Sequence, residues 1–178
     1  MYLIFALPRS RTTWLSVFLS NKSGLCYHDK SIEFATLKAI HEWGLDNPNC
    51  GIVDTALIVH WKKLMEMNPN VKFILIERPF CDVEESLKKI NLPTMSLGVL
   101  QKNLIEMKKD PRVMVIQFKD LDDMETCSKL YEYCTGLPFD LDRWELLRRI
   151  DMQPRITQII QDMYKNASNL TSLYGGKL

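Results

Sequence analysis

The chain has 178 residues, of which 46% are hydrophobic and 25% are charged, with a formal net charge of +1. This length suits one domain with a full hydrophobic core, and we expect residues 1–178 to form a single domain. No apolar run approaches the roughly 18 residues that cross a membrane, and a nearly neutral chain argues against a broad nucleic-acid surface.

The N-terminal segment and the cysteines indicate the cellular compartment. An apolar run begins at Tyr2, without the charged segment and cleavage site that a secretory signal peptide carries. The five cysteines are odd in number and contain no C-x-x-C pair. Because this pattern fits reduced thiols better than disulfides, we expect a cytoplasmic protein.

Short apolar runs alternate with amphipathic segments along the chain. Strands are expected at residues 2–6, 25–28, 51–54, 71–77 and 112–118. Helices are expected at residues 12–20, 31–44, 57–67, 80–90, 95–109, 123–135, 140–148 and 153–165. The polar segment 166–178 reads as a flexible tail. The alternation predicts a three-layer α/β/α fold with a central, mainly parallel sheet of about five strands.

The first fourteen residues contain the strongest functional signal. The strand at 2–6 leads into a loop with two arginines and three hydroxyls, Arg9 to Thr13, and then into an amphipathic helix. The first N–H groups of a helix have no partner within the helix, so this terminus binds phosphate or sulfate. Arginines and hydroxyls around it add charge-assisted donors.

The loop differs from that of nucleotide triphosphatases. When G-x-x-x-x-G-K-[ST] is aligned with Ala6 to Thr13, the two glycines fall on Ala6 and Arg11 and the lysine on Thr12. Because three of the four defining positions fail, ATP hydrolysis or kinase-type transfer through this loop is disfavoured.

The segment Pro8 to Leu15, PRSRTTWL, instead resembles the P-[KR]-S-G-T-T-W-L loop of sulfotransferases. In that family the loop grips the 5′-phosphosulfate of 3′-phosphoadenosine-5′-phosphosulfate (PAPS). Arg11 departs from the pattern because the family has glycine there. A side chain at this position requires either a changed backbone or an outward direction.

A second segment strengthens the resemblance. The apolar run 71–77 precedes Arg78, and the residues from Arg78 to Ser86 match R-x-x-x-D-V-x-x-S at all four named positions. In sulfotransferases this arginine and this serine bind the 3′-phosphate of the nucleotide. With a helix that starts near Phe80, Ser86 lies about two turns in, near the end of the strand.

The later chain resembles the family more loosely. Residues 113–121 are similar to the strand and Y-E-D-L turn of the superfamily, whereas the R-K-G-x-x-G-D-W segment that closes over the adenine is absent. Arg148, Arg149 and Arg155 are candidates to replace its charge. The resemblance is therefore to small bacterial or phage-type sulfotransferases with a P-loop-like fold.

The resemblance implies roles for the residues of both motifs. It makes Arg9, at the lysine position, a catalytic cation for the bridging and leaving-group oxygens. Trp14 would pack near the adenine, or alternatively would be a core tryptophan. The implied cofactor-binding residues are Arg9, Ser10, Arg11, Thr12, Thr13, Trp14, Arg78 and Ser86. The implied donor is PAPS, the product is adenosine 3′,5′-bisphosphate, and no metal is required.

The acceptor must lose a proton, and His28 and Asp29 end a predicted strand at the expected edge of the sheet. A histidine suits proton acceptance near neutral pH, and Asp29 either serves directly or orients the imidazole. Alternatively, His28 is a partly buried structural residue. Asp54 and Thr55 provide another base or acceptor contact, or a strand-end cap.

Three functions remain open at this point. The first is a sulfotransferase that moves a sulfuryl group from PAPS to a hydroxyl or amine acceptor. The second is a nucleotide-binding module without transfer activity, and the third is a kinase-like phosphotransferase. The sequence identifies neither the acceptor nor the oligomeric state.

Overall fold

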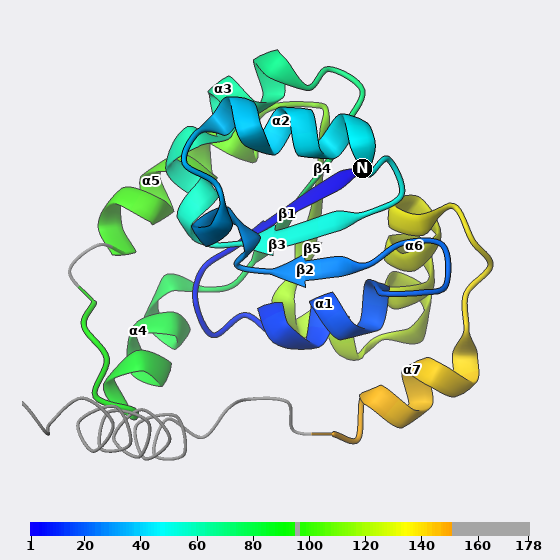
Figure 1. Cartoon of the computed structure of the whole chain (residues 1–178). Coiled ribbons are helices and arrows are strands. Elements are labelled where there is room, and N and C mark those ends of the chain that lie inside the picture. Colours follow the sequence, from blue (N-terminus) through cyan, green and yellow to red (C-terminus); the bar gives the residue numbers. More distant parts are fainter. Residues whose placement is uncertain (95–96, 151–178) are drawn as a thin grey trace, which may run out of the picture.

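A computed structural model describes residues 1–94 and 97–150 of the chain. Its centre is a five-stranded sheet, all parallel, in the order β2-β3-β1-β4-β5 (Figure 1). The strands are β1 (Tyr2–Ala6), β2 (Cys26–His28), β3 (Gly51–Asp54), β4 (Lys72–Glu77) and β5 (Val113–Gln117). The predicted α/β fold is thus confirmed, and all five strands lie where the apolar runs placed them.

The α-helices are α1 (Thr12–Leu19), α2 (Leu37–Asp46), α3 (Trp61–Met67), α4 (Phe80–Lys88), α5 (Leu97–Met107), α6 (Met124–Thr135) and α7 (Leu141–Leu147). Three short 3₁₀ helices are η1 (Lys30–Glu33), η2 (Ala56–His60) and η3 (Phe118–Asp122). The expected helix at 153–165 and the expected tail at 166–178 lie outside the described residues.

The single helix expected over residues 31–44 is wrong. The structure has η1 there, followed by an extended stretch, and α2 begins only at Leu37. Thr36 explains the break, because its backbone is extended and its side chain accepts a hydrogen bond from the N–H of Ala39. Threonine in this role is a preferred helix N-cap, so the chain begins a new helix here.

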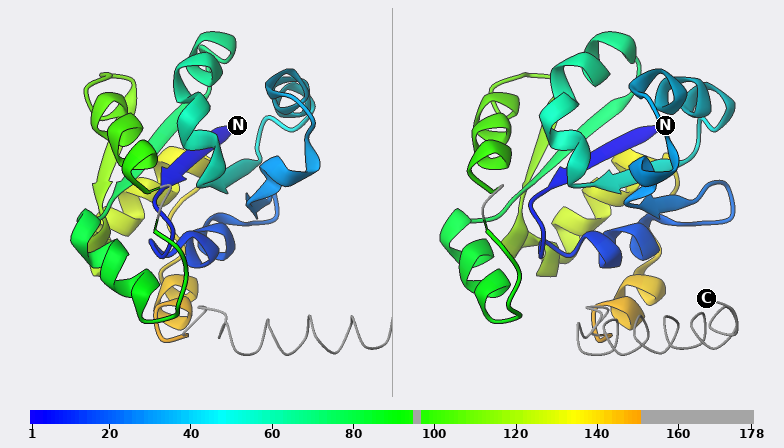
Figure 2. Two further views of the ribbon diagram at one scale, coloured as in Figure 1. Left: turned by 90° about the vertical axis from the view of Figure 1, so that its left-hand side faces the viewer. Right: turned by 60° about the vertical axis from the view of Figure 1, so that its left-hand side comes forward.

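Helices cover both faces of the sheet, as Figures 1 and 2 show. Side chains of β1 alternate between two buried clusters: Ile4 packs on the side of α1, α6 and α7, and Phe5 packs on the side of α2, α3 and α5. Both are 1% exposed. Parallel strands buried on both faces read as continuous apolar runs, which is why the strands were visible in the sequence. Among the described helices, none combines the length and the apolar character that a membrane span requires.

The topology brings two loops together at the carboxyl ends of neighbouring strands. The chain leaves β1 toward α1 on one face, whereas it leaves β4 toward α4 and α5, which pack on the other face. Where successive connections diverge in this way, a crevice opens outside the strand ends, and α/β proteins bind ligands there. The arginine-rich loop and Arg78 both lie at this position.

Candidate functional site

The loop between β1 and α1 has an unusual backbone. Arg9 and Arg11 both have positive φ angles, 67° and 58°. Between them Ser10 is completely buried, and its hydroxyl has no hydrogen-bond partner among the described residues. Leaving a buried polar group unpaired costs about 1–3 kcal/mol. A ligand at the N-terminus of α1 would therefore relieve a cost that the free protein bears.

Arg11 resolves the departure from the family pattern. It takes the left-handed backbone that glycine would take (φ 58°, ψ 28°), and its side chain turns outward as well. The guanidinium contacts the carboxylate of Asp122 in η3 at 2.7 and 3.2 Å and lies over the ring of Phe118. Arg11 therefore shapes the loop with its backbone, while its charge is already paired.

Arg9, Arg78 and Ser86, from the two motifs, come into contact. The guanidinium of Arg78 donates to the carbonyl oxygen of Arg9, and Nε of Arg9 lies 3.3 Å from Oγ of Ser86. Arg78 also stacks over the ring of Phe118, with its guanidinium carbon 4.3 Å from the ring centre. Residues more than sixty positions apart in sequence thus form one cluster.

The cluster concentrates positive charge. Burial lowers the pKa of Arg78; the carboxylate of Asp82 opposes this shift, and the charges of Arg9 and Arg11 add to it. Within the described part of the chain, Nε of Arg78 is buried without a hydrogen-bond partner. An anion placed beside these guanidinium groups would reduce the repulsion between the arginines.

His28 and Asp29 lie beside the same loop. Nε2 of His28 is 2.9 Å from Oγ1 of Thr12, and Nδ1 is 3.3 Å from Oδ2 of Asp29. The His28 side chain is 34% exposed, so a ligand can reach it. Burial raises the pKa of Asp29, and the adjacent His28 charge opposes that shift. The structure therefore brings the two expected base candidates to the loop between β1 and α1.

Asp54 caps the turn after β3 and is not free to act as a base. It is 1% exposed, and its two oxygens accept hydrogen bonds from the N–H groups of Ser31, Ala56 and Leu57. The hydroxyl of Thr55 donates to the carbonyl of Ala6. The alternative of a strand-end cap thus describes Asp54, since all of these bonds join segments of the fold.

Trp14 belongs to the core, as its alternative interpretation held. It is 6% exposed, stacks on Phe18 with ring centres 4.8 Å apart, and donates from Nε1 to the carbonyl of Leu147. Its ring is enclosed between α1 and α7, so contact with an adenine is not supported here.

The arginines considered as substitutes for the absent closing segment have other contacts. Arg148 and Arg149, at the end of α7, both lie 3.2 Å from the carboxylate of Glu145. Arg155 lies outside the described residues. Within the described ranges, no three His, Cys, Asp or Glu side chains gather in a metal-binding arrangement.

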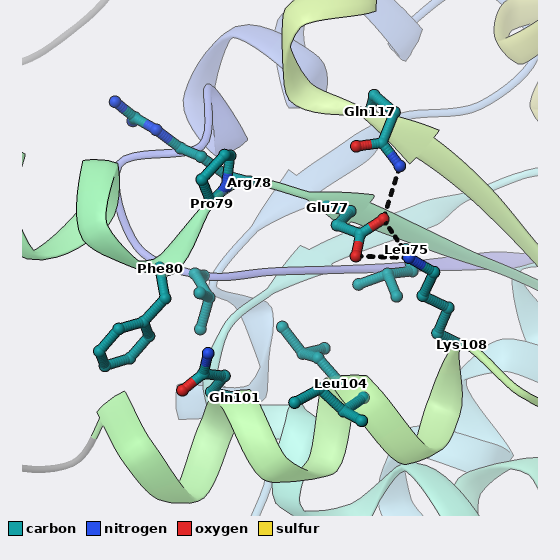
Figure 3. Close-up of a pocket in the computed structure, with 11 residues that line it drawn as sticks. Leu75, Glu77, Arg78, Pro79, Phe80, Gln101, Leu104, Lys108 and Gln117 are labelled. Atoms are coloured by element: carbon teal, nitrogen blue, oxygen red, sulfur yellow. Dashed lines mark hydrogen bonds and ion pairs between the residues drawn. The ribbon is translucent and has the colours of Figure 1, made fainter.

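One feature was missed from the sequence. A cavity of about 510 Å³ lies between the ends of β4 and β5 and helix α5 (Figure 3). Glu77 accepts from Lys108 at 2.7 Å and from Gln117 at 2.5 Å along its wall. The guanidinium of Arg78 points away from it (Figure 3). The one signal that could have indicated the cavity is the pairing of Glu77 with Gln117 in the register of β4 and β5.

The chain matches no model of a known protein family and no curated protein. The interpretation of the site therefore depends on its residues and their geometry.

The backbone of Arg11 leads to a prediction about stability. Replacing Arg11 by either Gly or Ala removes the exposed ion pair with Asp122, which is worth about 0.2–1 kcal/mol. Only glycine removes the left-handed strain of roughly 1–2 kcal/mol, although it also gains about 0.4–1 kcal/mol of freedom when unfolded. Arg11→Gly should therefore be more stable than Arg11→Ala by about 1 kcal/mol in urea denaturation. If Arg11→Ala is as stable as Arg11→Gly, or more stable, the loop does not require a left-handed backbone at this position.

Proposed function

We propose that this protein is a PAPS-dependent sulfotransferase that moves a sulfuryl group to a hydroxyl or amine acceptor. The observation that carries the proposal is the cluster of Arg9, Arg78 and Ser86 at the adjacent ends of β1 and β4. These are the residues that the two sulfotransferase-like motifs supply. The pairing of β1 with β4 brings the two loops together, and the contact of Arg9 with Ser86 joins side chains of the two motifs.

The proposed binding mode assigns each phosphate to one part of the cluster. Arg78 and Ser86 hold the 3′-phosphate, and the N-terminus of α1 with Ser10 and Thr13 holds the 5′-phosphate. Arg9 lies between them, since its side chain contacts Ser86 while its backbone belongs to the loop. The buried, unpaired hydroxyl of Ser10 supports an anion in the loop, because no donor or acceptor of the described chain satisfies it.

The proposed reaction breaks the bond between sulfur and a phosphate oxygen. Negative charge then grows on the phosphate, and a fixed guanidinium stabilises that charge more in the transition state than in the ground state. In this proposal, Arg9 supplies the guanidinium that stabilises the negative charge. The carboxylate of Asp29 beside Nδ1 of His28 favours a proton on that nitrogen, which leaves Nε2 to accept one.

We further propose that the protein acts in the cytoplasm. All five cysteines are free thiols, and three of them, Cys26, Cys127 and Cys134, are buried. Unpaired thiols are typical of a reducing compartment.

A nucleotide-binding module without transfer activity is the second candidate. The enclosed ring of Trp14 favours it, since the family's adenine contact is not offered here. Release of adenosine 3′,5′-bisphosphate from labelled PAPS in the presence of acceptors distinguishes the two. Titration with ATP tests the kinase-like alternative, for which we expect no specific binding.

The first prediction for this function concerns nucleotide selectivity. Adenosine 3′,5′-bisphosphate should bind more than tenfold more tightly than 5′-AMP, because hydrogen bonds to charged groups contribute about 1.5–3 kcal/mol each. Arg78→Ala should remove most of this preference in calorimetric titrations. Arg112→Ala, which removes an exposed arginine paired with Asp110, is the matched control and should keep the preference. Equal affinity of the native chain for both nucleotides would contradict the proposal.

The second prediction separates binding from catalysis at Arg9. Arg9→Lys keeps the charge and should retain partial activity, although lysine lacks the planar fork of arginine. Arg9→Ala should lower turnover by roughly 10²–10³-fold. Affinity for adenosine 3′,5′-bisphosphate should fall less than turnover, because the contacts of Arg78 remain. If Arg9→Ala lowered turnover and affinity for adenosine 3′,5′-bisphosphate by the same factor, Arg9 would be a binding residue only.

The third prediction concerns the base. His28→Ala should lower turnover by roughly 10²–10⁴-fold and leave product affinity nearly unchanged. Asp29→Asn should have a smaller effect if the carboxylate only orients the ring. His60→Ala, at an exposed histidine before α3, is the control. A large loss in Asp29→Asn together with nearly normal His28→Ala turnover would assign the base to Asp29.

A further inference from the structure

The nitrogen that would accept a proton in the proposed reaction already contacts a hydroxyl of the protein itself. Nε2 of His28 lies 2.9 Å from Oγ1 of Thr12. With a proton on Nδ1, beside the carboxylate of Asp29, Nε2 can only accept, so the hydroxyl of Thr12 donates to it. A hydroxyl has a single proton. That of Thr12 is therefore directed to His28 and is not available to a phosphate, while its lone pairs stay free.

Hydroxyl, imidazole and carboxylate in series form the arrangement that activates a hydroxyl as a nucleophile. Here the hydroxyl belongs to the first residue of α1, at the helix N-terminus that would hold the phosphosulfate. The unpaired hydroxyl of Ser10, completely buried in the preceding loop, independently indicates that this loop takes a ligand. Nucleophile and donor group would thus share one site.

The two residues that follow His28 have contacts that hold this segment in place. The N–H of Asp29 donates to the carbonyl of Val53 at 2.9 Å, which ties the residue to β3. Lys30, the next residue, lies 4.4 Å from the centre of the Tyr27 ring and forms an ion pair with Glu33 at 2.6 Å. These contacts of Asp29 and Lys30 fix the segment that presents His28 to Thr12.

We propose that Thr12 is itself an acceptor of the sulfuryl group, so that the protein forms a threonine O-sulfate in its own phosphate loop. This inference rests on the proposed function. In the step, a bond forms between Oγ1 of Thr12 and sulfur, and the bond between sulfur and the 5′-phosphate oxygen breaks. Its electron pair leaves with adenosine 3′,5′-bisphosphate. The proton of Thr12 passes to Nε2 of His28.

The test is incubation of the full chain with ³⁵S-labelled PAPS without any added acceptor, followed by peptide mapping. We expect a single sulfuryl group per chain, on Thr12. Thr12→Val should carry no label at this position, and Thr12→Ser should restore it. Thr126→Val, which removes a hydroxyl from the first turn of α6 and not from the proposed site, should keep the label on Thr12. His28→Ala should slow labelling by roughly 10²–10⁴-fold.

Calorimetry with adenosine 3′,5′-bisphosphate on each variant shows whether the site is folded. A native chain that binds this nucleotide and sulfates an added phenol or amine, but carries no label, would overturn the inference and keep the proposed function. Label on another residue, or label undiminished in Thr12→Val, would also overturn it. A native chain that neither binds the nucleotide nor uses PAPS would overturn both proposals.

Discussion

The hydrogen bond from Arg78 to the carbonyl of Arg9 is the contact on which the candidate site depends. It joins the end of β4 to the loop after β1, and it satisfies a carbonyl in a residue with a φ of 67°. A left-handed backbone costs roughly 1–2 kcal/mol outside glycine, so surrounding contacts must hold it. The same bond holds the guanidinium of Arg78 against the loop that carries Arg9. One contact therefore supports both the shape of the loop and the position of the Arg78 charge.

The arginine cluster concentrates positive charge at one point of the fold. Three arginines lie near one another, and two carboxylates oppose their repulsion: that of Asp82 near Arg78, and that of Asp122 in an exposed ion pair with Arg11, which is worth no more than about 1 kcal/mol. Rules of local structure are typically broken at functional sites, where another requirement outweighs them. An anion that binds only the folded chain would add about 2.7 kcal/mol of stability at a hundred times its dissociation constant. Under the proposed function, a phosphorylated ligand would offset the repulsion that remains between the arginines.

The sequence was sufficient for the sheet and for the grouping of the site residues. Long apolar runs identify buried parallel strands, and parallel strands bring their carboxyl ends, with Arg9, His28 and Arg78, to one edge. The sequence was not sufficient to predict the contacts of residues whose role depends on the direction of the side chain. Neither the enclosed ring of Trp14 nor the three N–H groups around Asp54 follow from spacing. The break before α2 depends on the cap at Thr36, which competes with an otherwise continuous helical pattern.

The cavity was missed for a related reason, because its lining comes from separate segments of the chain. These are Leu7 just after β1, the end of β4 with the residues that follow it to Phe80, the segment from α5 to Lys108, and Gln117 of β5. Spacing within one segment gives no sign of such a space. The register of β4 and β5 brings Glu77 and Gln117 together only after the sheet has formed.

The alternation of side chains at the end of β4 explains why the arginine cluster keeps its charge. Glu77 and Arg78 are adjacent in sequence, yet neighbouring residues of a strand point to opposite faces. Glu77 faces α5, where Lys108 and Gln117 bind its carboxylate and lower its pKa. Arg78 faces the loop after β1. A shift of one residue in the register would place the carboxylate of Glu77 among the arginines and neutralise part of their charge. The register that buries Leu75 and Ile76 on their two faces thus also keeps the carboxylate of Glu77 away from the arginine cluster.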